Sequence, residues 1–294
     1  MTSTSAPRFG AKIPQIELTG SADDIRTYAT TIRDLGYVHL TSEDHVLGGT
    51  PDYRGTPRAV FSSEYPVQEV FSLFSYVAGI APELEVASGV LILPQRQTAL
   101  VAKQSAAIEN LTGGKLRLGV GIGWNDLEYT TLGQAWANRA ARFEEQIELL
   151  RAFWSDPVID FQGKFHIVEN AGINPRPVSG RIPLWIGAAA EPAVRRAARL
   201  GDGFIPLGRL GGEAERQLAV FRDELRNVGR DPADVGLEGW INLTPGADEV
   251  WKHEAERWRS EGATHITLVT ERLGYRSLPD HLAALAKARD IIGS

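Results

Sequence analysis

Short apolar runs alternate with longer amphipathic segments along almost the whole chain. Eight apolar runs have the length and composition of buried strands, and each is followed by a segment whose apolar residues recur at helical spacing. Strands that alternate with helices favour a parallel sheet, and eight repeats predict an α/β fold closed into a (β/α)8 TIM barrel. The predicted strands are residues 9–15, 37–41, 84–93, 116–123, 182–188, 203–207, 235–243 and 265–269.

Predicted helices connect these strands. Their expected ranges are 21–35, 67–80, 98–111 and 192–200, with further helices starting near Arg139 and around residues 218–228, 250–258 and 282–292. Gly36 and Gly201 follow two of them, at the position where glycine commonly ends a helix.

The chain has 294 residues, more than the ~250 that are usual for such a barrel. Two insertions account for the excess: Gly48–Tyr65 after strand two, and the Gly- and Pro-rich segment Val158–Arg181 before strand five. The first insertion, which contains Tyr53 and Arg54, is predicted to be a lid that sets substrate choice. Residues 1–8 are expected to be a disordered leader, and residues 9–294 a single barrel domain.

Composition excludes several classes of function. The formal net charge of −6 argues against nucleic acid as a partner, and the absence of cysteine excludes disulfides, thiolate metal sites and cysteine nucleophiles. The start of the chain, MTSTSAPRFG, lacks the apolar core of a secretory signal, and no apolar run reaches membrane-spanning length. A cytoplasmic protein with no membrane partner is therefore expected.

The segment 116–129, LRLGVGIGWNDLEY, carries glycine at every second position of a predicted strand. Gly119, Gly121 and Gly123 remove the side chains from one face, which indicates a surface for a flat cofactor. Two alternatives remain open. The first is a dinucleotide-binding fingerprint, although its third glycine is missing here and no helix is expected directly after the strand. The glycines could also serve only for close packing or a bend.

Barrel enzymes place catalysis at the carboxyl ends of their strands. Strand two ends in Ser42-Glu43-Asp44-His45, and small residues recur at the ends of strands three to six, which suits a planar ligand. His45 is the best titratable candidate, as a proton partner or a hydrogen-bonding group. Its alternative role is to cap a strand or helix end.

Other polar residues have both a functional and a structural interpretation. Glu128 and Asp126 could act as acid or base, or lie in a solvated loop. Arg139 and Arg142 open a helix and could meet an anion, or Arg142 could pair with Glu145 or Gln146 along the same face. His39 is expected to pack inside. The remaining histidines lack metal-ligand spacing, so no metal is predicted.

The segment from Ser88 to Trp124, SGVLILPQRQTALVAKQSAAIENLTGGKLRLGVGIGW, resembles the luciferase-like monooxygenase superfamily, together with Asp44-His45 and the NDLEYTTLG that follows. The later segments RFEEQIELLR and IPLWIGA extend the resemblance over essentially the whole chain. Within the superfamily, GIGWNDLEYTTLG most resembles the branch that depends on coenzyme F420, an 8-hydroxy-5-deazaflavin.

This resemblance implies that the deazaflavin ring lies at the carboxyl face of the barrel, beside strands two to five. It implies a non-prolyl cis peptide at Gly89–Val90 that supports one ring face, and a histidine, His45, near the reactive edge. Trp124 stands where sugar-phosphate dehydrogenases of the family carry a proton-donating glutamate, so that role is not transferred. The expected cofactor-binding residues are Asp44, His45, Ser88, Gly89, Val90, Gly121, Gly123, Trp124, Asn125, Gly187 and Ala188.

The resemblance thus implies an oxidoreductase that transfers a hydride between F420 and an unidentified small organic substrate, with His45 as the catalytic residue. The alternative enzyme is an FMN-dependent, two-component monooxygenase. A barrel that binds flavin or deazaflavin without turnover is a further alternative. Trp251 and Trp258, if exposed, would favour a homodimer, although they could equally pack against the barrel.

Overall fold

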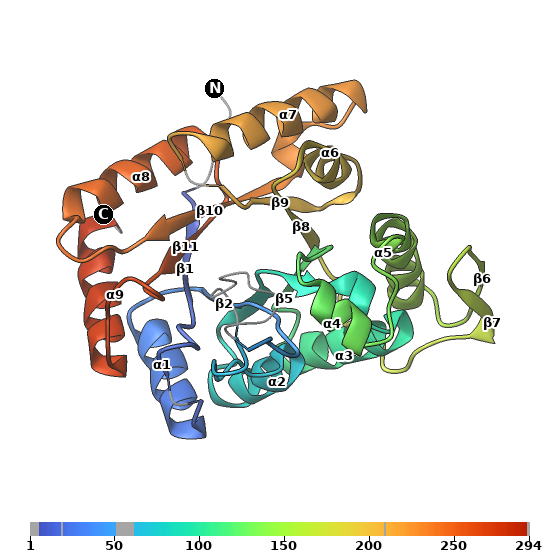
Figure 1. The fold of residues 1–294 in the computed structure, drawn as a ribbon, viewed down its shortest axis with the longest axis horizontal. Helices are drawn as coiled ribbons and strands as arrows, with labels where there is room; N and C mark the ends of the chain where they lie inside the picture. The colour runs from blue at the N-terminus through green and yellow to red at the C-terminus, as the bar shows by residue number, and fades with distance from the viewer. Residues whose placement is uncertain (1–5, 19, 51–61, 209, 293–294) are drawn as a thin grey trace.

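The computed structural model describes residues 6–18, 20–50, 62–208 and 210–292, and it confirms a closed barrel of parallel strands (Figure 1). Neighbouring strands follow the order β3-β2-β1-β11-β10-β9-β8-β5, and the pairing of β3 with β5 closes the ring. The barrel strands are β1 (Arg8–Lys12), β2 (His39–Ser42), β3 (Glu85–Ser88) with β4 (Leu91–Ile92), β5 (Leu116–Gly121), β8 (Leu184–Ala188), β9 (Gly203–Pro206), β10 (Gly236–Asn242) and β11 (His265–Val269).

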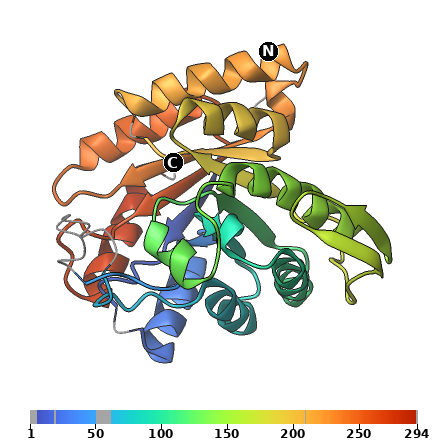
Figure 2. The same ribbon diagram turned by 45° about the vertical axis from the view of Figure 1, so that its right-hand side comes forward.

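Helices surround the strands on the outside (Figures 1 and 2). Their boundaries lie within a few residues of those predicted, and the hydroxyl of Ser21 caps the first of them by accepting the Asp24 N–H at 3.1 Å. The long helices are α1 (Ala22–Asp34), α2 (Val70–Ile80), α3 (Thr98–Leu111), α5 (Arg139–Ser155), α6 (Glu191–Leu200), α7 (Glu213–Asn227), α8 (Asp248–Ser260) and α9 (Leu278–Ile292). Short 3-10 turns η2 (Leu93–Gln95) and η3 (Pro232–Asp234) complete the connections. No helix in the described ranges is both long and apolar enough to cross a bilayer.

Trp251 and Trp258 lie in the core between the helices and the barrel. Their exposed fractions are 2% and 1%, and their indole N–H groups donate to the carbonyls of Thr244 and Trp240 at 3.1 and 3.2 Å. Of the two possibilities left open for these tryptophans, packing against the barrel is therefore confirmed, because helix α8 turns its apolar face inward. The homodimer that was inferred from them remains a prediction without that support.

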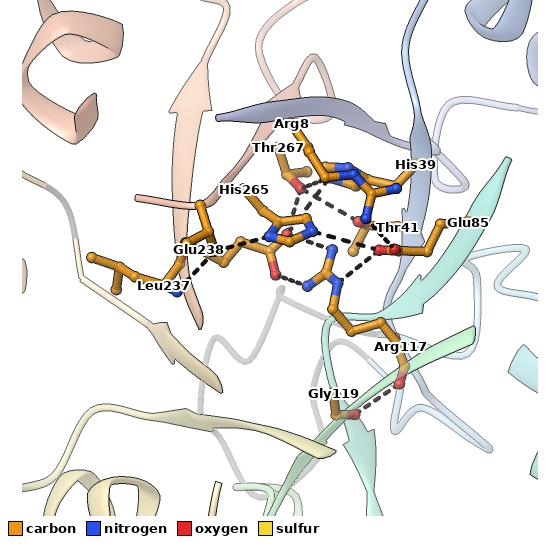
Figure 3. A network of polar contacts seen from close by, with 12 residues as sticks. Arg8, His39, Thr41, Glu85, Arg117, Gly119, Leu237, Glu238, His265 and Thr267 are labelled. Carbon is orange, nitrogen blue, oxygen red and sulfur yellow. Dashed lines mark hydrogen bonds and ion pairs between the residues drawn. The ribbon is translucent and has the colours of Figure 1, made fainter. Parts of the chain in front are cut away.

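Ionic groups fill the amino-terminal part of the barrel interior (Figure 3). The Arg117 guanidinium on β5 donates to Glu85 on β3 at 2.8 Å and to Glu238 on β10. Thr267 then links Glu238 to His39, with distances of 2.6 and 2.8 Å. This barrel network joins strands from both halves of the chain. His39 therefore packs inside, as predicted, and burial lowers its pKa well below the usual value, with the nearby Arg117 charge as a second cause.

The third barrel strand is interrupted where a continuous run from 84 to 93 was predicted. β3 pairs with β5 at Val86–Leu116, and pairing resumes only at Leu91–Val120 in β4. Between them, the peptide bond Gly89–Val90 is cis, as the family resemblance implied. The residues between β3 and β4 thus leave the ladder and project at the carboxyl end of the barrel.

The second insertion contains a β-hairpin, formed by β6 (Ile159–Gln162) and β7 (Ile167–Ala171), which lies beyond α5 at the edge of the molecule (Figures 1 and 2). His166 fastens the hairpin, because its ring nitrogens lie 2.7 Å from a Glu145 carboxylate oxygen and 2.8 Å from the Thr98 hydroxyl. Glu145 therefore pairs with this histidine. In the first insertion, residues 51–61 lie outside the described residues, and with them most of the predicted lid.

Candidate active site

A cavity of about 580 Å³ lies at the carboxyl ends of the barrel strands. Every predicted cofactor-binding residue lines it except Ser88. The lining residues that the prediction did not include are Lys12, Glu43, Ile92, Ile122, Glu128, Arg139, Ala189, Ala190, Ala193 and Leu207. Its volume is in the range of small-molecule and cofactor sites, and its walls combine backbone and small apolar side chains with a few charged groups.

Val90 forms the wall that the glycine strand was expected to form. A Cβ atom at Gly121 would lie 2.7 Å from Val90 Cγ2, and a Cβ at Gly187 would lie 2.6 Å from Val90 Cγ1. At Gly119 the Cβ would approach the Ser88 carbonyl oxygen to 1.9 Å. The glycines therefore make room for the residues around the break in strand three. The expected bare glycine face is instead covered by these residues. Close packing, one of the two alternatives, describes them better.

The side chains of Ser88 and Asn125 form hydrogen bonds with the backbone of the protein. The Ser88 hydroxyl is buried and donates to the Gly119 carbonyl at 2.8 Å. Asn125 accepts the Leu127 N–H at 3.2 Å and so caps a short helix, α4 (Asp126–Thr131). The expectation that no helix follows the glycine strand at once is therefore wrong. Asn125 still lines the cavity.

His45 meets a buried carboxylate. Its Nδ1 lies 3.3 Å from Glu128 Oε1, and Glu128 is 1% exposed. The same oxygen accepts the backbone N–H groups of Val46 and Leu47 at 2.8 and 3.2 Å. Because a carboxylate only accepts hydrogen bonds, Nδ1 is the donor. Glu128 thus holds the loop after β2 and fixes the imidazole, which rules out a solvated loop position.

Asp44 anchors the chain that follows the break in strand three. Its Oδ1 accepts from Arg96 Nη2 at 2.6 Å, and its Oδ2 accepts the Ile92 N–H at 3.0 Å. The carboxylate is 1% exposed. Burial lowers the pKa of Arg96, but the charges and hydrogen bonds of Asp44 and Glu69 together outweigh burial, so the pKa is raised above the usual value. Asp44 lines the cavity, and a role in holding the cofactor stays a prediction.

The two arginines at the start of α5 have different surroundings. Arg139 lines the cavity, stacks on the Trp136 ring at 3.7 Å, and keeps its buried Nε without a hydrogen-bond partner among the described residues. Arg142 instead donates to the Arg96 carbonyl at 3.4 Å. Only Arg139 is placed to meet an anionic group in the cavity.

Lys12, Glu43 and Glu271 form a buried cluster at the ends of β1, β2 and β11, here called the lysine cluster. The Lys12 ammonium lies 2.8 Å from Glu43 Oε2 and also pairs with Glu271. Burial and the neighbouring Glu43 charge raise the pKa of Glu271 to about 7, although Lys12 acts in the opposite direction. Lys12 and Glu43 line the cavity. Position near strand ends could have revealed Glu43 and Glu271, whereas Lys12 lies within a predicted strand and the pairing of all three needs the closed barrel.

Comparisons with known proteins agree with this fold. A sequence model of luciferase-like monooxygenases matches residues 5–288. An uncharacterized protein of Mycobacterium tuberculosis is 32% identical over 262 residues, which is 87% of this chain and 88% of that protein. The FMNH2-dependent dimethylsulfone monooxygenase of Pseudomonas fluorescens is 31% identical over 153 residues, 51% of this chain and 41% of that protein.

A solved structure shares the fold at low sequence identity. The coenzyme F420 dependent tetrahydromethanopterin reductase of Methanopyrus kandleri has a TM-score of 0.75 and 12% identity, and the comparison covers 98% of this chain and 99% of that one. An FMNH2-dependent enzyme is thus similar in sequence to about half of this chain, and an F420-dependent enzyme shares its fold. From the match over nearly its whole length, the chain belongs to the luciferase-like monooxygenase family of oxidoreductases.

Proposed function

We propose that this protein is an F420-dependent oxidoreductase that transfers a hydride between the deazaflavin and a small organic substrate. The observation that carries the proposal is the cavity at the barrel mouth, where His45 and the cis Gly89–Val90 segment line one space of about 580 Å³. The similarity of GIGWNDLEYTTLG to the F420-dependent branch supports this choice of cofactor.

The residues present fit a planar, phosphate-bearing cofactor. Val90 and the backbone of Gly121 and Gly187 provide a surface without bulky polar groups, and the unpartnered Nε of Arg139 is suited to an anionic group. Residues Gly89, Val90, Gly187 and Ala188 would hold the ring, and Arg139 its phosphate. When bound, the deazaflavin would supply hydride transfer at its C5 carbon.

The chain itself would orient the substrate, exclude water and move a proton. His45 would exchange that proton through Nε2, because Glu128 already accepts from Nδ1 and so fixes the tautomer. Trp124, whose ring centroid lies 6.0 Å from that of His45, would limit access to the imidazole. His45 and Trp124 both line the cavity. The wall that positions the substrate would therefore also supply the proton.

The first experiment is a titration of the purified protein with oxidised F420 and, in parallel, with FMN, followed by cofactor fluorescence. Micromolar or tighter binding of F420 with much weaker binding of FMN is expected. His45→Ala should then lower turnover far more than F420 affinity, since the histidine acts on a proton and does not form the ring surface. Unchanged turnover would remove His45 from the mechanism.

FMN-dependent monooxygenation is the second candidate. The 31% identity to a monooxygenase that uses FMNH2, over about half of the chain, favours it. Preferential FMN binding, followed by oxygen uptake with reduced FMN, would select this candidate over the first. A cytoplasmic location and a homodimer remain predictions under either one.

A further inference from the structure

We propose that Glu43 is a hydrogen-bond acceptor for a hydroxyl group of the molecule bound in the cavity, with Lys12 holding its carboxylate in place. The inference rests on the proposed function in taking this cavity as the cofactor and substrate site. The hydroxyl can come from the substrate or from the polyol side chain that joins ring and phosphate in flavin-type cofactors.

Glu43 is a buried carboxylate with an unused oxygen. It is 6% exposed and lines the cavity, and its Oε1 has no hydrogen-bond partner among the described residues. Its Oε2 faces the Lys12 ammonium at 2.8 Å. Buried polar atoms in folded proteins are nearly always paired, so an unpaired carboxylate oxygen in a residue that lines the cavity calls for a donor from the ligand.

The charge of the lysine cluster favours a neutral donor over a cationic one. Lys12 carries one positive charge between two carboxylates. Burial and the Glu43 charge raise the pKa of Glu271, so this carboxyl takes up a proton more readily than an exposed glutamate does. The cluster then has a net charge between zero and −1. A hydroxyl can donate to Glu43 in both states without adding a buried charge.

Two substitutions distinguish the acceptor role of Glu43 from a general effect of removing a carboxylate from the lysine cluster. Glu43→Gln removes the charged acceptor and leaves the Lys12–Glu271 pair. Glu271→Gln is the matched control, because it removes the same charge from the same lysine but leaves Glu43 in the cavity wall; Glu271 does not line the cavity. Circular dichroism and thermal unfolding should show that both variants fold.

The test uses two pairs of probes that differ in a hydroxyl donor. Riboflavin and lumiflavin share a ring but only riboflavin has a polyol, and cyclohexanol donates a hydrogen bond whereas its methyl ether does not. Flavin fluorescence follows the first pair, and ligand-observed NMR follows the second. We expect the wild type and the Glu271→Gln variant to prefer the hydroxyl member of one pair by about tenfold, as for a hydrogen bond to a charged group. We expect the Glu43→Gln variant to lose that preference.

The outcomes identify the source of the hydroxyl. If the Glu43→Gln variant loses the preference for riboflavin, Glu43 binds a hydroxyl of the cofactor side chain. If it loses the preference for cyclohexanol, Glu43 binds a hydroxyl of the substrate. Equal binding within both pairs by the wild type, no binding of any probe, or an unchanged preference in Glu43→Gln would overturn the inference. Failure of the proposed function looks different: F420 and FMN turnover would be absent while the Glu43-dependent preference persists.

Discussion

Val90 occupies the space that a side chain at position 121 would need, since a Cβ on Gly121 would lie 2.7 Å from Val90 Cγ2. Gly121→Ala should therefore push Val90 into the cavity. We expect a folded protein whose free energy of unfolding falls by about 1–3 kcal/mol, the usual cost of overpacking, and which binds the preferred cofactor more weakly. Thermal or urea unfolding measures the first effect, and a titration measures the second.

A second substitution tests the cause. Val90→Ala removes both Cγ atoms and should restore much of the binding in the Gly121→Ala background. Gly119→Ala is a contrasting variant, because its Cβ would meet the Ser88 carbonyl oxygen at 1.9 Å, and backbone cannot move aside cheaply. It should reduce the free energy of unfolding by at least about 3 kcal/mol. Equal stability of the two alanine variants would contradict this account.

Glu128 should determine which nitrogen of His45 carries the proton. Its carboxylate accepts from Nδ1, so NMR of the imidazole nitrogens should show the Nδ1–H tautomer in the neutral ring. Glu128→Gln keeps an oxygen for the Val46 N–H and weakens this preference. Asp126→Asn, which removes a charge from the same short helix, is the control. An unchanged tautomer ratio in Glu128→Gln would show that the loop alone orients the ring.

The Asp44–Arg96 ion pair should contribute to stability more than a surface pair does. Asp44→Asn leaves the largely buried Arg96 without its closest charge partner, and we expect a loss of about 3 kcal/mol in the free energy of unfolding. Glu191→Gln breaks the exposed pair with Arg195 and should change it by less than about 1 kcal/mol. Urea denaturation of both variants gives the comparison, and similar losses would argue against an anchoring role for Asp44.

Buried histidines should make the protein sensitive to mild acid. Burial lowers the pKa of His265 to about 3, and that of His39 falls well below the usual value for the same reason. A folded-state pKa below the unfolded value means that the unfolded chain takes up protons first, so stability is present above about pH 6.5 and is lost as pH falls. Each histidine contributes about 1.4 kcal/mol per pH unit until its folded-state pKa is reached.

Thermal unfolding between pH 7.5 and 4.5 measures this effect. His39→Gln cannot take up the proton, so its melting temperature should fall less with pH than that of the wild type, even if it starts lower. His253→Gln alters an exposed histidine on α8 and is the control. Parallel pH curves for the wild type and His39→Gln would refute the assignment to His39.

Periodicity predicted the barrel well because it reports burial along one segment at a time. Residues 98–111 and 265–269 form a helix and a strand with the predicted bounds. The same reasoning left open whether Trp251 and Trp258 are exposed or packed inside, since the side of α8 that faces inward depends on its packing against the barrel. Even the glycine strand, correctly predicted as a strand, was given the wrong reason for its glycines, which depends on Val90 about thirty residues earlier.

The site was predictable in position but not in pairing. Strand ends placed His45 and Gly187 at one mouth of the barrel, because parallel strands end on the same side. The contact of His45 with Glu128 joins residues 83 apart in the chain, and no local pattern carries it. Lys12 was missed because a lone lysine in an apolar strand gives no signal until Glu43 and Glu271 are brought to it.

The barrel network has a consequence for how the chain folds. Arg117 on β5 and Glu238 on β10 are 121 residues apart, so the fourth and the seventh barrel strands must both be in place before this pair forms. In a fragment that ends after β5, Arg117 would still pair with Glu85 but would lack Glu238. Burying the arginine with only one of these two carboxylates would cost considerable free energy. Contacts so distant in sequence also slow folding. The two halves of the barrel are therefore expected to become stable together, late, in one cooperative closing step.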